Sequence, residues 1–275
     1  MLLFVRHGVR GIEGITPVFA SGENLSFYGQ IYSYKLGKYI RKKYGVIDMI
    51  YPDNNTERTI ATGIAIAKGN RVDEIYLSEE KPDSFFSAKF NQDPNEVRKR
   101  LEENKDKIEE LAKEVNLERK NGNIQELLKD LSGLSNVPAF SKLSKMKCEI
   151  PKSVENICLI KEKILYGDVF GNLGRDMMNK ITYLLKRNKL SVLVGHDESN
   201  IGLLSLYFNK TFSVDGYCPG YIPPNSGFIF TLCENKVKIE ILYLTTEGKF
   251  KVKSYKCVPN IFEEKEIGKL KKIDV

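Results

Sequence analysis

Histidine is almost absent from this chain: its 275 residues include only His7 and His196. Cysteine is scarce as well, and the five cysteines show no CxxC pair and no zinc-type spacing with the histidines. No apolar run approaches the ~18 residues needed to cross a membrane. The sequence therefore predicts neither a metal centre nor a membrane span, and the odd cysteine count leaves at least one thiol outside any disulfide.

Each of the two histidines comes soon after a short apolar run. Residues 2–5 (LLFV) lead into His7, and residues 190–194 (LSVLV) lead into His196. Short apolar runs bounded by glycine and charge are typical of buried strands, and open α/β sheets bind ligands at the carboxyl ends of their strands. A single histidine is usually structural. Two at matching strand ends, one beside arginines and one beside an aspartate, predict a shared site.

A third candidate is Arg58. The pattern predicts a strand over 46–51, a turn, and then a helix that Asn55 or Thr56 caps, that runs to Lys68 and that Gly69 terminates. Arg58 would lie in the first turn of that helix, where unpaired N–H groups already attract anions. Alone, such an arginine is more often simply exposed. Further expected elements are helices over 26–44, 172–187 and 199–208, short amphipathic helical pieces around 124–131 and 154–165, and antiparallel strands over about 228–241.

The stretch 76–165 differs from the rest because it is rich in Lys, Glu and Asn and its pattern is mostly helical. Asp93-Pro94-Asn95-Glu96 is a typical helix start, with a helical pattern continuing to Val115. We therefore predict a three-layer α/β core with a mainly parallel central sheet, formed by residues 1–75 and 166–275. A smaller helical cap domain, residues 76–165, would be inserted in it, with the active site between the two.

The net charge of +7, from 43 basic and 36 acidic residues, favours anionic partners. Most of the lysines are expected on a solvated surface. The charge run over 102–114 mixes both signs, which favours a solvated helix face over a nucleic-acid site. The sequence shows no aromatic-basic motif and no recognition-helix pattern, which argues against nucleic acid as a partner. Among anionic partners a small phosphate ester therefore stays open, and neither a membrane nor nucleic acid is expected.

The segment Arg6-His7-Gly8-Val9-Arg10, together with His196-Asp197, resembles the histidine acid phosphatases. These form the RHGxR branch of the histidine phosphatase superfamily, which includes phytases and glucose-1-phosphatase. Three further elements follow the order of that family: residues 25–44, residues 57–62 with Arg58, and residues 223–227 (PPNSG) before a strand. The helical stretch lies where the family inserts its α domain. The resemblance covers most of the chain and implies a phosphoglycerate-mutase-like core.

The resemblance implies an acid phosphatase, phytase-like or sugar-phosphatase-like, that works without cofactor or metal. His7 would be the nucleophile that becomes phosphohistidine, and Asp197 would protonate the leaving group. The implied phosphate ligands are Arg6, Arg10, Arg58 and His196. Arginine forks suit phosphate oxygens and stay charged. Their charge disfavours the imidazolium form of His7, so a neutral nucleophile and a protonated Asp197 can coexist under mildly acidic conditions.

Three features depart from the family. It usually reads His-Asp-x-Asn, whereas here Asn200 comes one residue later, which leaves Asp197 or Glu198 as the proton donor, with Asp197 favoured. The loop 11–23 lacks the proline that commonly follows the second motif arginine, which bears on substrate choice. The family is normally exported and disulfide-bonded, whereas an apolar strand begins here at residue 2. A cytoplasmic protein and the mature form of an exported one both fit the sequence.

Two alternatives to hydrolysis stay open. One is a catalytically silent phosphate-binding or regulatory protein, although no expected site residue is missing. The other is a phosphoglycerate-mutase-like phosphotransferase. That branch reads RHGE or RHGQ, whereas Val9 stands at the position of the Glu or Gln. The sequence leaves the physiological substrate and the oligomeric state undecided.

Overall fold

The computed structural model describes the chain in several ranges: residues 1–10, 24–81, 83, 85–86, 93–115, 124–125, 127–128, 131, 143, 169–197, 199–200, 202–203, 214, 217 and 222–275. The strands are β1 (Leu2–Arg6), β2 (Met49–Pro52), β3 (Glu74–Ser78), β4 (Ser191–Gly195), β5 (Gly227–Cys233), β6 (Lys236–Leu244), β7 (Phe250–Pro259) and β8 (Leu270–Asp274). The helices are α1 (Phe27–Tyr44), α2 (Glu57–Asn70), α3 (Pro94–Glu103), α4 (Lys105–Glu114) and α8 (Val169–Leu185).

A six-stranded sheet in the order β2-β4-β1-β5-β6-β7 forms the middle layer. The strands β2, β4 and β1 are parallel, whereas β5, β6 and β7 pair antiparallel with their neighbours. A separate pair is formed by β3 and β8. The parallel strands therefore come early or in the middle of the chain and the antiparallel ones late, as the sequence predicts.

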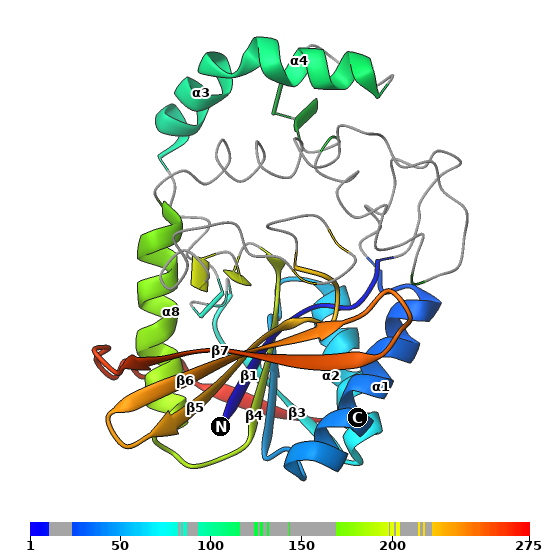
Figure 1. The fold of residues 1–275 in the computed structure, drawn as a ribbon, viewed down its shortest axis with the longest axis vertical. Coiled ribbons are helices and arrows are strands. Elements are labelled where there is room, and N and C mark those ends of the chain that lie inside the picture. The colour runs from blue at the N-terminus through cyan, green and yellow to red at the C-terminus, as the bar shows by residue number, and fades with distance from the viewer. Residues whose placement is uncertain are drawn as a thin grey trace.

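Helices cover both faces of this sheet (Figure 1). On one face, Leu36 of α1 and Ile66 of α2 pack with Leu3 of β1. On the other face, Met177 of α8 belongs to the same apolar cluster as Phe4 of β1. Successive β1 residues thus face opposite layers, which explains why the whole strand is apolar and buried. The predicted three-layer α/β fold class is confirmed.

The two helices on the first face cross at very short distance because each carries a glycine at the crossing. A Cβ atom on Gly69 would lie 2.0 Å from the backbone oxygen of Tyr34, and one on Gly37 would lie 2.1 Å from that of Ile66. The prediction that Gly69 ends α2 is wrong, since the helix continues to Asn70 and Arg71 is the C-cap. Packing against α1, rather than helix termination, explains this glycine.

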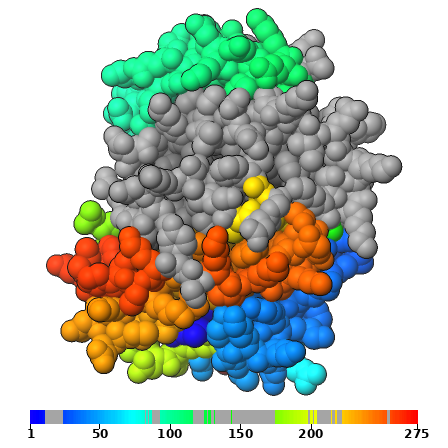
Figure 2. All heavy atoms as spheres, viewed as in Figure 1, coloured from blue at the N-terminus to red at the C-terminus, as the bar shows by residue number. Residues whose placement is uncertain are grey.

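The described part of the helical stretch consists chiefly of α3 and α4. The Asp93 side chain caps α3 by accepting a hydrogen bond from Asn95 N at 2.9 Å. The single helix predicted up to Val115 is divided at Asn104, which ends α3 and precedes α4. Figures 1 and 2 show both helices (green) at the end of the molecule opposite α1 and the late strands. They bury their own apolar cluster, made of Leu101, Ile108, Leu111, Ala112, Leu127, Leu128 and Leu131.

The division into a core (1–75 and 166–275) and an insert (76–165) stays a prediction. At the first predicted boundary, residue 75, the chain is still part of the core. Strand β3 runs to Ser78, and both Phe85 and Phe86 pack in the core cluster with Phe4. The helix predicted over 172–187 is present as α8, which begins three residues earlier and ends two residues earlier. Of the helix predicted over 199–208, the four described residues are helical. The predicted short helix over 154–165 lies outside the described residues, and none of the helices in the described ranges could span a membrane.

The glycine at the helix crossing gives a stability test with a clear sign. Alanine is a better helix former than glycine by about 1 kcal/mol, so Gly69→Ala would stabilise an unhindered helix. Here the new methyl group meets backbone, and we expect a loss of roughly 1–3 kcal/mol in the free energy of unfolding. Urea denaturation measures the change, with the exposed neighbour variant Lys68→Ala as a near-neutral control. Stabilisation by Gly69→Ala would contradict the crossing.

Candidate active site

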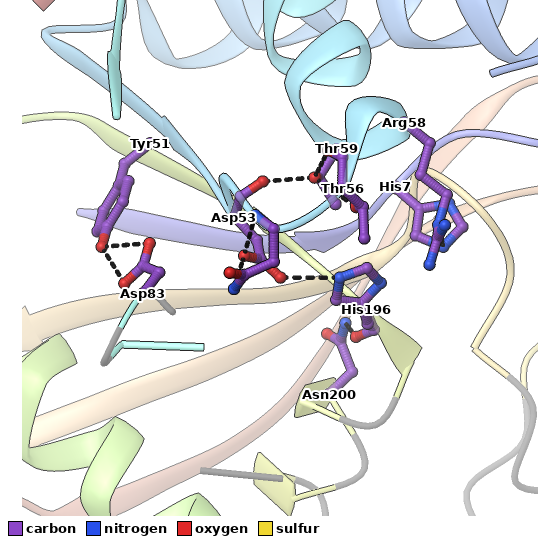
Figure 3. Close-up of polar contacts among 10 residues, drawn as sticks. His7, Tyr51, Asp53, Thr56, Arg58, Thr59, Asp83, His196 and Asn200 are labelled. Carbon is purple, nitrogen blue, oxygen red and sulfur yellow. Dashed lines mark hydrogen bonds and ion pairs between the residues drawn. The ribbon is translucent and has the colours of Figure 1, made fainter. Parts of the chain in front are cut away.

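The carboxyl ends of three parallel strands position the site. In the strand register Arg6 of β1 lies opposite Gly195 of β4, and Pro52 of β2 lies opposite Val194. His7 and His196 therefore follow neighbouring strands at the same edge of the sheet. Their ring centroids are 5.4 Å apart, and the rings meet edge to face. The structure thus brings together the two histidines that the sequence singled out, and buries both (Figure 3).

The contacts of His7 decide which ring nitrogen carries the proton. Nδ1 lies 2.8 Å from the carbonyl oxygen of Gly8, which can only accept, so Nδ1 must donate. On the other side Arg58 Nε donates to His7 Nε2 at 3.3 Å, so Nε2 offers its lone pair. The imidazole is therefore neutral, and its free electron pair points toward the guanidinium of Arg58.

The electrostatic surroundings of His7 favour the same neutral form. Its side chain is buried, which lowers the pKa of the imidazole well below its usual range because burial penalises the charged form. The positive charges of Arg10, His196, Arg6 and Arg58 lower this pKa further. The His7 imidazole therefore keeps its free electron pair, because protonation from solution is unfavourable beside these cations.

Arg58 reaches His7 from the first turn of α2, as the sequence predicts, and its side chain is buried. Thr56 is the N-cap residue, but its side chain caps no backbone N–H. The turn is fixed instead by Thr59, whose hydroxyl donates a hydrogen bond to the backbone oxygen of Asp53. One turn further on, Thr62 Oγ1 accepts from Gly8 N at 3.0 Å and so connects α2 to the loop that carries His7.

Arg6 is buried at the end of β1 and extends along the site. Its Nη1 donates to the backbone oxygen of Ile222 at 2.6 Å, and its Nη2 pairs with Asp197 Oδ2 at 3.4 Å. The PPNSG segment braces the backbone here, with Arg6 N donating to Ser226 O and Asn225 N donating to Arg6 O. This segment thus supports the orientation of the first motif.

The remaining site residues also gather at this edge. Arg10 pairs with Leu25 in an isolated bridge just before α1, and its charge acts on His7. Asn200 Nδ2 donates to the backbone oxygen of His196 at 2.9 Å, so the asparagine that comes one residue late in the motif holds the histidine backbone. Glu198, the alternative proton donor, and the loop 11–23 lie outside the described residues.

One residue of the site was missed by sequence reasoning, which assigned it only to a turn. Asp53 directly follows β2, is fully buried, and its Oδ2 lies 2.9 Å from His196 Nε2. The available signal was its position: a carboxylate directly after a strand is placed at the same edge as the two histidines. Figure 3 shows the contacts of Asp53 with Thr59 in the first turn of α2 and with His196.

The site therefore presents an uncharged nucleophilic nitrogen surrounded by guanidiniums and a second imidazole. Such a donor set fits a multivalent oxyanion, because each guanidinium can make two charge-assisted hydrogen bonds. Within the described ranges no three His, Cys, Asp or Glu side chains form a group that could hold a metal ion.

Comparison with known proteins bears on the fold. No family model matches this sequence, and no curated protein is a significant match to it. The phytase of Klebsiella sp. ASR1 has a TM-score of 0.62 at 13% identity, over 93% of this chain and 88% of that one. The phytase from Citrobacter braakii also has a TM-score of 0.62, at 14% identity, over 99% and 90%. The fold that the resemblance to the histidine acid phosphatases predicts is therefore confirmed.

The neutral state of His7 can be observed directly, because the chain has only two histidines. We expect long-range nitrogen-15 correlation spectra to show one imidazole as the neutral Nδ1–H tautomer from neutral pH down to about pH 5, where an ordinary histidine is charged. His7→Gln assigns that signal by removing it. A His7 signal that titrates near its ordinary pKa, or that shows the Nε2–H tautomer, would contradict the geometry.

Proposed function

We propose that this protein is a phosphatase that hydrolyses phosphate monoesters through a phosphohistidine at His7. The observation that carries the proposal is the lone pair of His7 Nε2, held 3.3 Å from the guanidinium of Arg58 in a buried, cationic site. The fold shared with the two phytases is consistent with it. Because those proteins are named phytases, inositol phosphates are candidate substrates beside sugar phosphates and other monoesters.

Phosphoryl transfer requires positioning and charge stabilisation more than covalent chemistry from the protein. Three arginines and His196 supply that charge. Arg6 and Arg58 are buried, where charge-assisted hydrogen bonds to phosphate are stronger than in water. In this proposal they bind the phosphate together with Arg10, which leaves His7 Nε2 in line with the ester bond.

The reaction proceeds in two balanced steps. The electron pair of His7 Nε2 forms a bond to phosphorus while the ester P–O bond breaks, and Asp197 gives its proton to the departing alkoxide. Water then attacks the phosphohistidine, and the Asp197 carboxylate takes a proton from it. The P–N bond breaks, its electron pair returns to Nε2, and inorganic phosphate leaves.

In this proposal substrate binding changes the contact between Asp197 and Arg6, and this change favours protonation of Asp197. Without substrate, a guanidinium at 3.4 Å favours the ionised carboxylate. A bound phosphate engages Arg6 and places its own negative charge beside Asp197. Both changes favour the protonated acid, so the proton is taken up where and when the leaving group needs it.

The proposed chemistry predicts hydrolysis of p-nitrophenyl phosphate in EDTA, with higher activity under mildly acidic conditions than at neutral pH. His7→Ala removes the nucleophile, and we expect kcat to fall by roughly 10⁴-fold or more. Lys68→Ala, an exposed change on the far part of α2, serves as the control. An alkaline detergent quench of the wild-type reaction should leave a phosphoprotein that is stable in alkali and loses its phosphate in acid.

Other outcomes would point to the alternatives. Phosphate binding without turnover in the wild type would favour a binding or regulatory protein. Transfer of phosphate between substrate and an added acceptor, with little release of free phosphate, would favour a phosphotransferase. Equal activity in His7→Ala and the wild type would show that the nucleophile is assigned wrongly.

The proton donor can be tested by varying the leaving group. An alkyl phosphate needs protonation of its leaving oxygen much more than p-nitrophenyl phosphate does. We therefore expect Asp197→Asn to lower kcat by about 10²–10⁴-fold for an alkyl phosphate and by much less for p-nitrophenyl phosphate. Glu198→Gln is the matched control. If the Glu198 variant shows the leaving-group dependence and the Asp197 variant does not, the roles are reversed.

A further inference from the structure

Asp53 has a place in the site that neither the motifs nor the reaction scheme accounts for. We propose that Asp53 is a positioning residue for phosphate binding. Its buried carboxylate holds His196 as an imidazolium that presents its second N–H to the phosphate, and its backbone oxygen fixes the helical turn that carries Arg58. The inference rests on the proposed function, since it assigns a role within the same phosphate site.

The first argument is the number of donors on this carboxylate. Oδ2 lies 2.9 Å from His196 Nε2. Oδ1 accepts from the backbone N of Asn55 at 2.9 Å and from its side-chain Nδ2 at 2.6 Å. An ionised carboxylate only accepts hydrogen bonds, so three donors on a fully buried aspartate fit the ionised form and fix its orientation.

The second argument concerns the protons of His196. The nitrogen that faces Asp53, Nε2, carries a hydrogen in this contact. If the ring were neutral, Nδ1 would hold a lone pair and would repel a phosphate oxygen. His196 can therefore be a phosphate donor only with both nitrogens protonated, and a carboxylate at 2.9 Å provides the opposite charge that this form needs.

The other charged groups of the site make this compensation necessary. Arg6 and Arg10 at the β1 end and Arg58 on α2 are cations, and His7 stays neutral beside them. Asp197 is paired with Arg6. These positive charges oppose an imidazolium at His196, and the carboxylate of Asp53 offsets them there. Contacts thus separate the two rings: His7 meets a carbonyl and a guanidinium, whereas His196 meets a carboxylate.

A second buried carboxyl group lies on the side of Asp53 away from His196. Asp83 is buried there and accepts a hydrogen bond from the Tyr51 hydroxyl. Burial raises the pKa of Asp83 to about 6, and the negative charge of Asp53 contributes to that rise. Figure 3 shows the Tyr51–Asp83 pair next to Asp53 and apart from the two histidines.

The third argument is mechanical. Thr59 Oγ1 donates to the backbone oxygen of Asp53 at 2.5 Å, and Asp53 N donates to Val194 O at 2.9 Å. Asp53 is therefore bonded to the last part of β4, to His196 after it, and to the first turn of α2. One residue sets the spacing between His196 and Arg58, which approach the phosphate from different elements.

The test uses Asp53→Asn, which keeps the shape of the side chain but removes its charge, with Asp83→Asn as a matched buried control. In nitrogen-15 spectra of the free protein at about pH 7, we expect His196 of the wild type and of Asp83→Asn to be charged and that of Asp53→Asn to be neutral. Affinity for inorganic phosphate, by calorimetry, should fall about 10- to 100-fold in Asp53→Asn at that pH.

The pH dependence separates charge compensation from a merely structural role. At about pH 5 the solvent protonates His196 more readily, so the affinity gap between Asp53→Asn and the wild type should narrow. A gap of equal size at both pH values would overturn the proposal. So would a neutral His196 in the wild type, a result that does not require the variant to fold. Both readouts use the resting protein, so a failure of hydrolysis is distinguished from a failure of this inference.

Discussion

Concentrated positive charge in a buried place is the constraint on which the rest of this structure depends. Arg6, Arg58 and His196 lie at the edge of the sheet with little exposure to water, and buried charges are costly unless they are paired. Two carboxylates offset part of that cost, Asp53 on His196 and Asp197 on Arg6. In the proposed function an arriving phosphate neutralises the remaining excess of positive charge, so the charge that is costly in the resting protein is also the charge that would recognise the substrate.

The fold meets this constraint with backbone rather than with side chains alone. The parallel pairing of β1 with β4 places His7 and His196 side by side, because the residues after both strands leave the sheet at one edge. The close packing of α2 against α1 then places Arg58 at that edge. The PPNSG segment, hydrogen-bonded to Arg6, closes the antiparallel side. Arg6, Arg58 and His196 come from different elements, which is why the site depends on the register of the whole core.

Most of this arrangement could be predicted from the sequence wherever a local pattern had a local cause. Helix α1 is capped by Ser26 and Gly45, whose roles depend on neighbouring residues, and the two histidines follow short apolar runs of the kind that is typical of buried strands. Gly69 misled the prediction because its role comes from the distant residue Tyr34, and a glycine near a helix end has the same appearance in either role. Asp53 was missed for a similar reason: in the sequence it is a turn aspartate, and only the sheet brings it to His196.

The two carboxylates at the site have different fates in the proposed reaction, and their surroundings explain the difference. Asp53 is fully buried, its Oδ1 is held by Asn55, and its Oδ2 by Nε2 of His196, which leaves Nδ1 of that ring for the phosphate. The contact with His196 can therefore persist through the proposed reaction. Asp197 keeps 15% of its side chain exposed and meets Arg6 at a longer 3.4 Å, a contact that phosphate can replace. A permanent partner sets the charge of one phosphate ligand, while a displaceable one is released to act as the acid. The same residue type thus serves two tasks because burial and hydrogen bonding differ.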